Sequence, residues 1–182
     1  FMNANWHKIF AFQLLDNSGI DYNQVLIADA DTMIHPKAPN IFDYTDNKFC
    51  AVHGYGSYDW ECRSIENYQK HFFPNIDLDL FEYFNSGMMV CNKKHKDFYD
   101  AVIDFYKLNQ ESIVKMQETY SVGTDQPVLN FLVKSENMQH MNRYEILDEE
   151  LTFTKIGWIY HFNGIPDEIR NYAMKKTSEV LL

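Results

Sequence analysis

The stretch Val25-Leu26-Ile27-Ala28-Asp29-Ala30-Asp31-Thr32 decides how the rest of the chain is interpreted. Its first half is wholly apolar, which is typical of a buried strand in a parallel sheet, because such a strand has no face toward solvent. Two aspartates follow the strand directly. In open α/β sheets, ligands bind beyond the carboxyl ends of the strands. Asp29 and Asp31 therefore stand where a ligand is expected.

Other helices and strands are predicted to alternate around this stretch. Apolar periodicity predicts helices at about 6–16, 94–116, 125–134 and 166–182, and strands at about 49–53, 84–91 and 158–162. Thr124 is a suitable cap for the third helix, and Pro127 is tolerated in its first turn. The alternation predicts an α/β fold in which helices flank a mixed sheet, with one domain spanning residues 1–182.

The predicted helix over residues 94–116 carries an apolar face. Phe98, Val102 and Phe105 recur at helical spacing along one side. We expect all three side chains to be buried against the sheet.

Composition and charge narrow the classes of partner. The chain has 182 residues, 46% of them hydrophobic and 16% aromatic, which is enough for a substantial core and argues against disorder. The formal net charge of −10 disfavours nucleic acids and anionic membranes, because both would repel the protein. An acidic protein that binds a diphosphate needs a local cation, and this requirement points to a metal ion.

Cysteines and the absence of long apolar runs bear on the compartment. Cys50, Cys62 and Cys91 are odd in number and form no CxxC pair, so they are interpreted as reduced thiols in a cytoplasmic or cytosol-facing protein. No run of 18 apolar residues predicts a transmembrane segment. The helical pattern begins almost at Phe1, which suggests a fragment whose upstream part is missing.

The Asp29-Ala30-Asp31 triplet can hold a hard cation between two carboxylates. Bound Mg²⁺ or Mn²⁺ could bridge two phosphates and act as a Lewis acid. Acidic pairs at strand ends also cap helices or remain solvated, so the triplet alone does not establish a metal site. A haloacid-dehalogenase-like phosphotransferase is disfavoured, because Met33 stands where its pattern needs Thr or Val and no later GDxxxD motif is present.

Residues 6–32 and 39–43 resemble the glycogenin-like (family 8) glycosyltransferases. Three further stretches match in the family's order: YFNSGMMV at 83–90, TDQPVLN at 124–130 and HFNG at 161–164. The resemblance spans residues 6 to 175, nearly the whole chain. It implies a GT-A-like nucleotide-diphospho-sugar transferase fold, a nucleotide-sugar donor, Mn²⁺ and retention of the anomeric configuration.

The resemblance also implies roles for individual residues. Asp29, Asp31 and His161 would bind the metal, and an imidazole beside carboxylates suits Mn²⁺ better than Mg²⁺. Asp125 and Gln126 would be the catalytic pair that hydrogen-bonds the transferred sugar. The donor would be contacted by Lys8, Asn85, Ser86, Gly164 and, near the ribose, Asp29.

Each of these residues also has a plain structural interpretation. Without the resemblance, a core position would be favoured for His161 and a solvated surface position for Lys8, and Asp125 and Gln126 would suit an ordinary helix start equally well. Asn85 and Ser86 could simply form a turn with the glycine that follows. These alternatives stay open at the level of sequence.

Two features depart from the family pattern. Three residues after Gly164, where members often carry a lysine, this chain has Asp167; Arg170, one helical turn later, is a candidate replacement. The first nucleotide-binding strands of the family should precede Trp6 and are absent from this sequence.

The resulting hypothesis is a metal-dependent, retaining hexosyltransferase. It would move a hexose from a nucleotide diphosphate sugar, UDP-linked by analogy, to a hydroxyl of a glycan, protein or small-molecule acceptor. Two alternatives remain: another metal-dependent phosphoryl- or nucleotidyltransferase, and a non-catalytic domain that binds sugar nucleotides.

Overall fold

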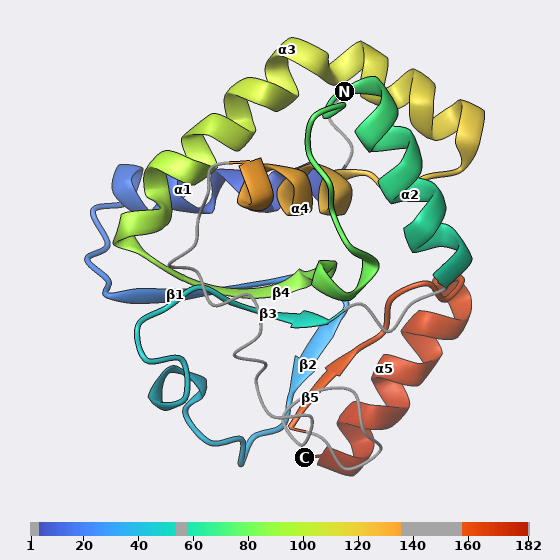
Figure 1. Ribbon diagram of the computed structural model, residues 1–182. Helices are drawn as coiled ribbons and strands as arrows, with labels where there is room; N and C mark the ends of the chain where they lie inside the picture. The colour runs from blue at the N-terminus through green and yellow to red at the C-terminus, as the bar shows by residue number, and fades with distance from the viewer. Residues whose placement is uncertain (1–3, 54–57, 136–157, 182) are drawn as a thin grey trace.

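Two small sheets meet at the turn that carries Asp29 and Asp31 (Figure 1). The computed structural model describes residues 4–53, 58–135 and 158–181. Its strands are β1 (Gln24–Ala28), β2 (Thr32–Ile34), β3 (Cys50–His53), β4 (Phe84–Asn92) and β5 (Ile159–His161). Its α-helices are α1 (Ala11–Asn17), α2 (Tyr58–His71), α3 (Lys96–Tyr120), α4 (Asp125–Ser135) and α5 (Asp167–Leu181). Short 3₁₀ helices are η1 (Ala4–Phe10), η2 (Ile41–Asp43), η3 (Leu80–Glu82) and η4 (Lys93–His95).

The order of the larger sheet is β1-β4-β3, and β2 pairs with β5 in the second sheet. Every strand pair among the described residues is antiparallel. The mixed α/β class and the predicted positions of the strands are confirmed. The expectations of a mixed sheet and of a buried parallel strand at residues 25–28 were wrong: the pairing of β1 with β4 is antiparallel, β1 lies at an edge among the described strands, and of its residues only Ile27 is buried. A short apolar run does not distinguish these cases, because it lacks the periodicity that reports which faces are covered.

The central strand β4 is buried on both faces. Met89 and Cys91 belong to the large core beneath the helices, whereas Met88 and Val90 belong to a smaller cluster on the other face. The alternation follows from the two-residue period of a strand. On the helical side, α1 and α4 lie next to the sheet and α3 crosses outside them (Figure 1).

The apolar face of α3 matches its prediction in part. Phe98 and Val102 are buried in the large core. Phe105 is only partly buried, so its expected full burial was wrong. Its ring stacks on Phe73, just after α2, with ring centroids 5.1 Å apart. Phe105 thus packs against the segment that follows α2.

Among the described residues, no helix combines the length and the apolar character that a transmembrane helix requires.

Candidate metal-binding cleft

The turn between β1 and β2 places the two aspartates at the junction of the sheets. The Asp29 amide donates to the Gly87 carbonyl of β4 at 2.8 Å, which continues the β1–β4 pairing. The Thr32 amide donates to the Asp29 carbonyl at 3.0 Å and closes the turn. In the second sheet, Thr32 lies opposite His161, so His161 is carried to the side of Asp31.

Asp29, Asp31 and His161 each offer one ligand atom, and these atoms lie within 4.8 Å of one another. His161 Nε2 is 3.2 Å from Asp31 Oδ1 and 3.8 Å from Asp29 Oδ2. Two carboxylates and an imidazole form a donor set suited to Mn²⁺ or Mg²⁺. The convergence expected from the sequence is therefore observed, while the role of the three residues as metal ligands stays a prediction.

Gly87 provides the space that the His161 ring occupies. A Cβ atom at position 87 would lie 2.1 Å from His161 Cε1 and 2.8 Å from its Nε2. Contacts that short are forbidden, so the imidazole sits against bare backbone. Sequence reasoning assigned no role to Gly87, because nothing local in the Asn-Ser-Gly stretch shows that a distant ring packs on it.

The environment of His161 favours the neutral imidazole. Its side chain is only 3% exposed. Burial lowers the pKa of His161 below its usual value, although the nearby carboxylates of Asp31 and Asp29 act in the opposite direction. A neutral imidazole is the form that binds metals.

Arg170 extends from the first turns of α5 toward the acidic pair. Its Nε is 3.4 Å from Asp31 Oδ2 and donates to the Phe162 carbonyl at 3.1 Å. A second nitrogen donates to the Ile165 carbonyl at 2.9 Å. The guanidinium is thus held beside Asp31, and its replacement of the family lysine stays a prediction. Asp167, which occupies that lysine's position in sequence, forms an ion pair with Arg170 at 3.1 Å.

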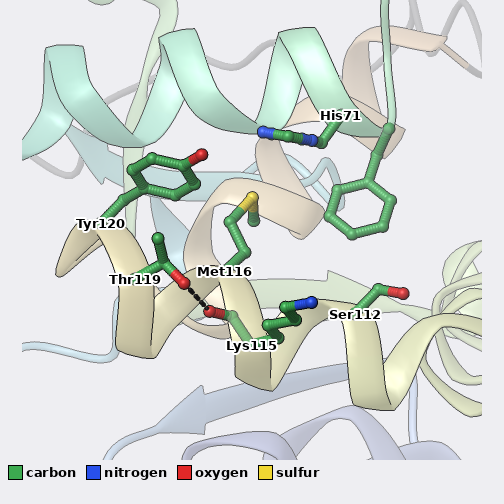
Figure 2. Close-up of a pocket in the computed structure, with 7 residues that line it drawn as sticks. His71, Ser112, Lys115, Met116, Thr119 and Tyr120 are labelled. Atoms are coloured by element: carbon green, nitrogen blue, oxygen red, sulfur yellow. Dashed lines mark hydrogen bonds between the residues drawn. The ribbon is translucent and has the colours of Figure 1, made fainter.

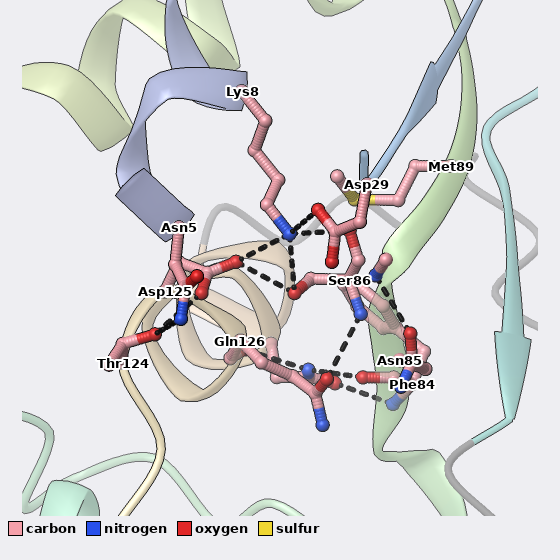
Figure 3. Close-up of polar contacts among 12 residues, drawn as sticks. Asn5, Lys8, Asp29, Phe84, Asn85, Ser86, Met89, Thr124, Asp125 and Gln126 are labelled. Carbon is pink, nitrogen blue, oxygen red and sulfur yellow. Dashed lines mark hydrogen bonds and ion pairs between the residues drawn. The ribbon is translucent and has the colours of Figure 1, made fainter. Parts of the chain in front are cut away.

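Lys8, from η1, lies at the centre of a second group of polar contacts (Figure 3). Its ammonium is 2.7 Å from Asp29 Oδ1 and 3.0 Å from Asp125 Oδ2, and it donates to the Ser86 carbonyl at 3.0 Å. Burial alone would lower the pKa of Lys8, but the Asp125 and Asp29 carboxylates raise it above its ordinary value. Lys8 is therefore a charged group inside the cleft, and the solvated-surface interpretation does not hold.

Asp125 and Gln126, at the start of α4, are both buried and both hold Ser86. The Ser86 hydroxyl donates to Asp125 Oδ2 at 2.7 Å, and the Ser86 amide donates to Gln126 Oε1 at 3.1 Å (Figure 3). The Thr124 hydroxyl donates to Asp125 Oδ1 at 2.7 Å. These contacts give Asp125 and Gln126 a structural task in addition to any contact with a sugar.

Local backbone structure accounts in part for the residue types at positions 85 and 164, asparagine and glycine. Asn85 Oδ1 accepts a hydrogen bond from the Gly87 amide at 2.7 Å, the short-range bond of an Asx turn. Gly164 has a φ of +66°, a conformation that favours glycine, and apart from its chain neighbours no atom of the described residues lies within 4 Å of the place where its Cβ would be. Residues 85–87 nevertheless belong to strand β4, so the alternative interpretation of Asn85 and Ser86 as part of a simple turn is wrong.

A single cleft of about 970 Å³ brings these groups together. All nine residues predicted from the sequence line it: Lys8, Asp29, Asp31, Asn85, Ser86, Asp125, Gln126, His161 and Gly164. A separate hollow of about 370 Å³ lies between α2 and α3, lined by His71, Lys115 and Tyr120 among others (Figure 2). None of the predicted site residues lines that hollow.

Comparisons with protein families, with curated proteins and with solved structures gave no match.

Proposed function

We propose that this protein is a metal-dependent glycosyltransferase that uses a nucleotide diphosphate sugar and retains the anomeric configuration. The observation that carries the proposal is the convergence of Asp29, Asp31 and His161 in a cleft that also contains Lys8 and Asp125. A GT-A arrangement of the chain and a uridine base are part of the proposal, on the strength of the motif resemblance.

The charges of the cleft are consistent with a divalent cation. Its lining includes four carboxylates, from Asp29, Asp31, Glu61 and Asp125, and three cationic side chains, from Lys8, Arg63 and Arg170. With these groups ionised and His161 neutral, one negative charge is in excess. A diphosphate would be repelled by that excess, whereas a bound divalent ion would reverse its sign.

The residues around the triad would hold the reacting groups in place. Lys8 fixes the Asp29 carboxylate through a 2.7 Å ion pair, and Arg170 adds a positive charge next to Asp31. Bound Mn²⁺ or Mg²⁺ would supply Lewis-acid stabilisation of the charge that develops on the departing diphosphate. Asp125 and Gln126 fix Ser86 and the β4 backbone along the cleft. This arrangement supports transfer by electrostatic stabilisation and positioning.

The test is release of nucleoside diphosphate from a nucleotide sugar, with UDP-glucose and UDP-galactose as the first donors. We expect release in Mn²⁺ and its loss in excess chelator. Asp31→Asn keeps the size of the side chain but removes one anionic ligand, so the rate should fall by about 10²–10³-fold. Asp104→Asn, at an exposed position on α3, is the matched control and should leave the rate unchanged.

The products separate the proposal from its alternatives. Release of pyrophosphate or phosphate would identify a nucleotidyl- or phosphoryltransferase. Binding of the donor without turnover would identify a non-catalytic sugar-nucleotide-binding domain. Equal rates for wild type and Asp31→Asn, or full activity in chelator, would refute the metal mechanism.

A further inference from the structure

The Lys8 ammonium lies between two carboxylates that belong to different parts of the cleft (Figure 3). It is 2.7 Å from Asp29 Oδ1, just after β1, and 3.0 Å from Asp125 Oδ2, at the start of α4. Its third close contact is the Ser86 carbonyl of β4, at 3.0 Å. An ammonium has three N–H donors, and three protein oxygens surround this one. The hydrogen-bonding capacity of Lys8 is therefore met within the protein itself.

The two carboxylates differ in their relation to the metal triad. Asp29 is one of the three proposed ligands, and its two oxygens have separate neighbours. Oδ1 is held by Lys8 at 2.7 Å, whereas Oδ2 lies on the side of His161, 3.8 Å from its Nε2. Asp125 does not belong to the triad. Lys8 is thus in contact with the proposed metal site on one side and with the start of α4 on the other.

Asp125 is a fixed and buried charge. Its Oδ1 accepts from the Thr124 hydroxyl and its Oδ2 from the Ser86 hydroxyl, both at 2.7 Å. The side chain of Asp125 is 5% exposed and that of Lys8 is 8% exposed. Charges shielded from water in this way interact more strongly than charges at the surface. The positive charge of Lys8 is therefore shared between two carboxylates, and a change at one of them is felt at the other.

We propose that Lys8 is a positioning residue that couples Mn²⁺ affinity at the triad to the carboxylate of Asp125. Lys8 holds one oxygen of Asp29 and leaves the other toward His161, while Asp125 offsets part of the charge of the ammonium. Without the charge of Asp125, the ammonium would be paired with Asp29 alone, and Asp29 would become a poorer ligand for a cation. The inference rests on the proposed metal site. It gives Lys8 this role in place of the donor contact that the motif resemblance implies.

Binding of Mn²⁺ in the absence of any nucleotide sugar tests the coupling. The electron paramagnetic resonance signal of free Mn²⁺ gives the dissociation constant, and circular dichroism establishes that each variant is folded. Asp125→Asn keeps the size of the side chain and should weaken Mn²⁺ binding about tenfold, a scale typical of residues in one ion-pair network. Asp97→Asn is the matched control and should leave the affinity unchanged. Asp97 also lies in the first turn of a helix, α3, but it is exposed and does not line the cleft.

The route of the effect is tested in proteins that lack the ammonium. In Lys8→Met, the further change Asp125→Asn should alter Mn²⁺ affinity by only about twofold, because the charge that Asp125 offsets is gone. Lys8→Gln is a second uncharged background, and its amide can still donate to a carboxylate, so it should be less destabilised. All titrations are made in sucrose, which favours the folded state and keeps destabilised variants folded.

The outcomes separate the coupling from the function on which it rests. Absence of Mn²⁺ binding by the wild type would refute the proposed metal site and the coupling with it. Wild-type affinity in Asp125→Asn would refute the coupling alone. An equal loss with and without the Lys8 ammonium would also refute it, since the effect would then come from the direct field of Asp125. Release of nucleoside diphosphate plays no part in these titrations, so glycosyl transfer is decided separately.

Discussion

Gly87→Ala should weaken metal binding although it replaces none of the proposed metal ligands. The added Cβ would lie 2.1 Å from His161 Cε1, whereas carbon atoms in contact settle at about 3.5–4.0 Å. The imidazole would have to withdraw by roughly 1.5 Å, and metal–ligand distances tolerate only about 0.2 Å. We expect Mn²⁺ affinity to fall about 10–100-fold, the loss typical when the support of a ligand is removed. Isothermal titration with MnCl₂ measures this directly.

A double-mutant cycle shows whether the effect passes through His161. If Gly87 acts only by making room for that ring, Gly87→Ala should cost little further affinity once His161→Ala is present. Circular dichroism and a thermal melt must show that the single variant is folded, because overpacking costs about 1–3 kcal/mol of stability. Wild-type affinity in Gly87→Ala, or fully additive losses in the double variant, would refute the reasoning.

The other predictions concern stability. Lys8→Met removes the cation between Asp29 and the buried Asp125, so the free energy of unfolding should fall by about 3 kcal/mol in a urea titration. Lys93→Met breaks an exposed ion pair with Asp21; it is the control and should change the free energy of unfolding little. Equal effects of the two variants would contradict the burial assigned to the Lys8 ion pairs. Acidification should destabilise the protein through His95, whose ring nitrogen accepts a hydrogen bond from the Asn92 amide at 3.0 Å. Burial, with a smaller contribution from Lys94, lowers the pKa of His95 to about 4 from 6.5 in the unfolded chain. The unfolded chain therefore binds the proton first, and stability that is complete above pH 6.5 is lost as pH falls toward 4, by about 2–3 kcal/mol. Denaturant midpoints at stepped pH values should show this slope in the wild type and a shallower one in His95→Gln, and the same slope in both proteins would exclude His95 as its source.

Local sequence patterns predicted most of the helices and strands, because each leaves its own periodicity, but α2 and β2 were not predicted. The apolar runs at β3 and β4 and the helical face of α3 are examples of such patterns. The direction in which strands pair is a tertiary property, and the four apolar residues of β1 carry no information on whether a neighbour covers one edge or both. Thus the strand at residues 25–28 was located correctly and its pairing was not.

The candidate site was predictable where the sequence itself supplies the chemistry. Asp29 and Asp31 follow a strand, and this placement marks a ligand site in many α/β proteins. Gly87 could not be recognised in the same way. Its importance lies in what packs on it, and its partner, His161, is far along the chain.

The Lys8 ammonium joins segments that are distant in sequence, and this has a consequence for folding. Its partners lie in the turn after β1, in β4 and at the start of α4, up to residue 125. Closing such long loops costs chain entropy before any contact compensates for it, so contacts of this kind form late. An intermediate with only its local helices formed would lack the assembled cleft. Metal affinity should then appear only with the last cooperative step of refolding, which would make the ion a reporter of the finished native state.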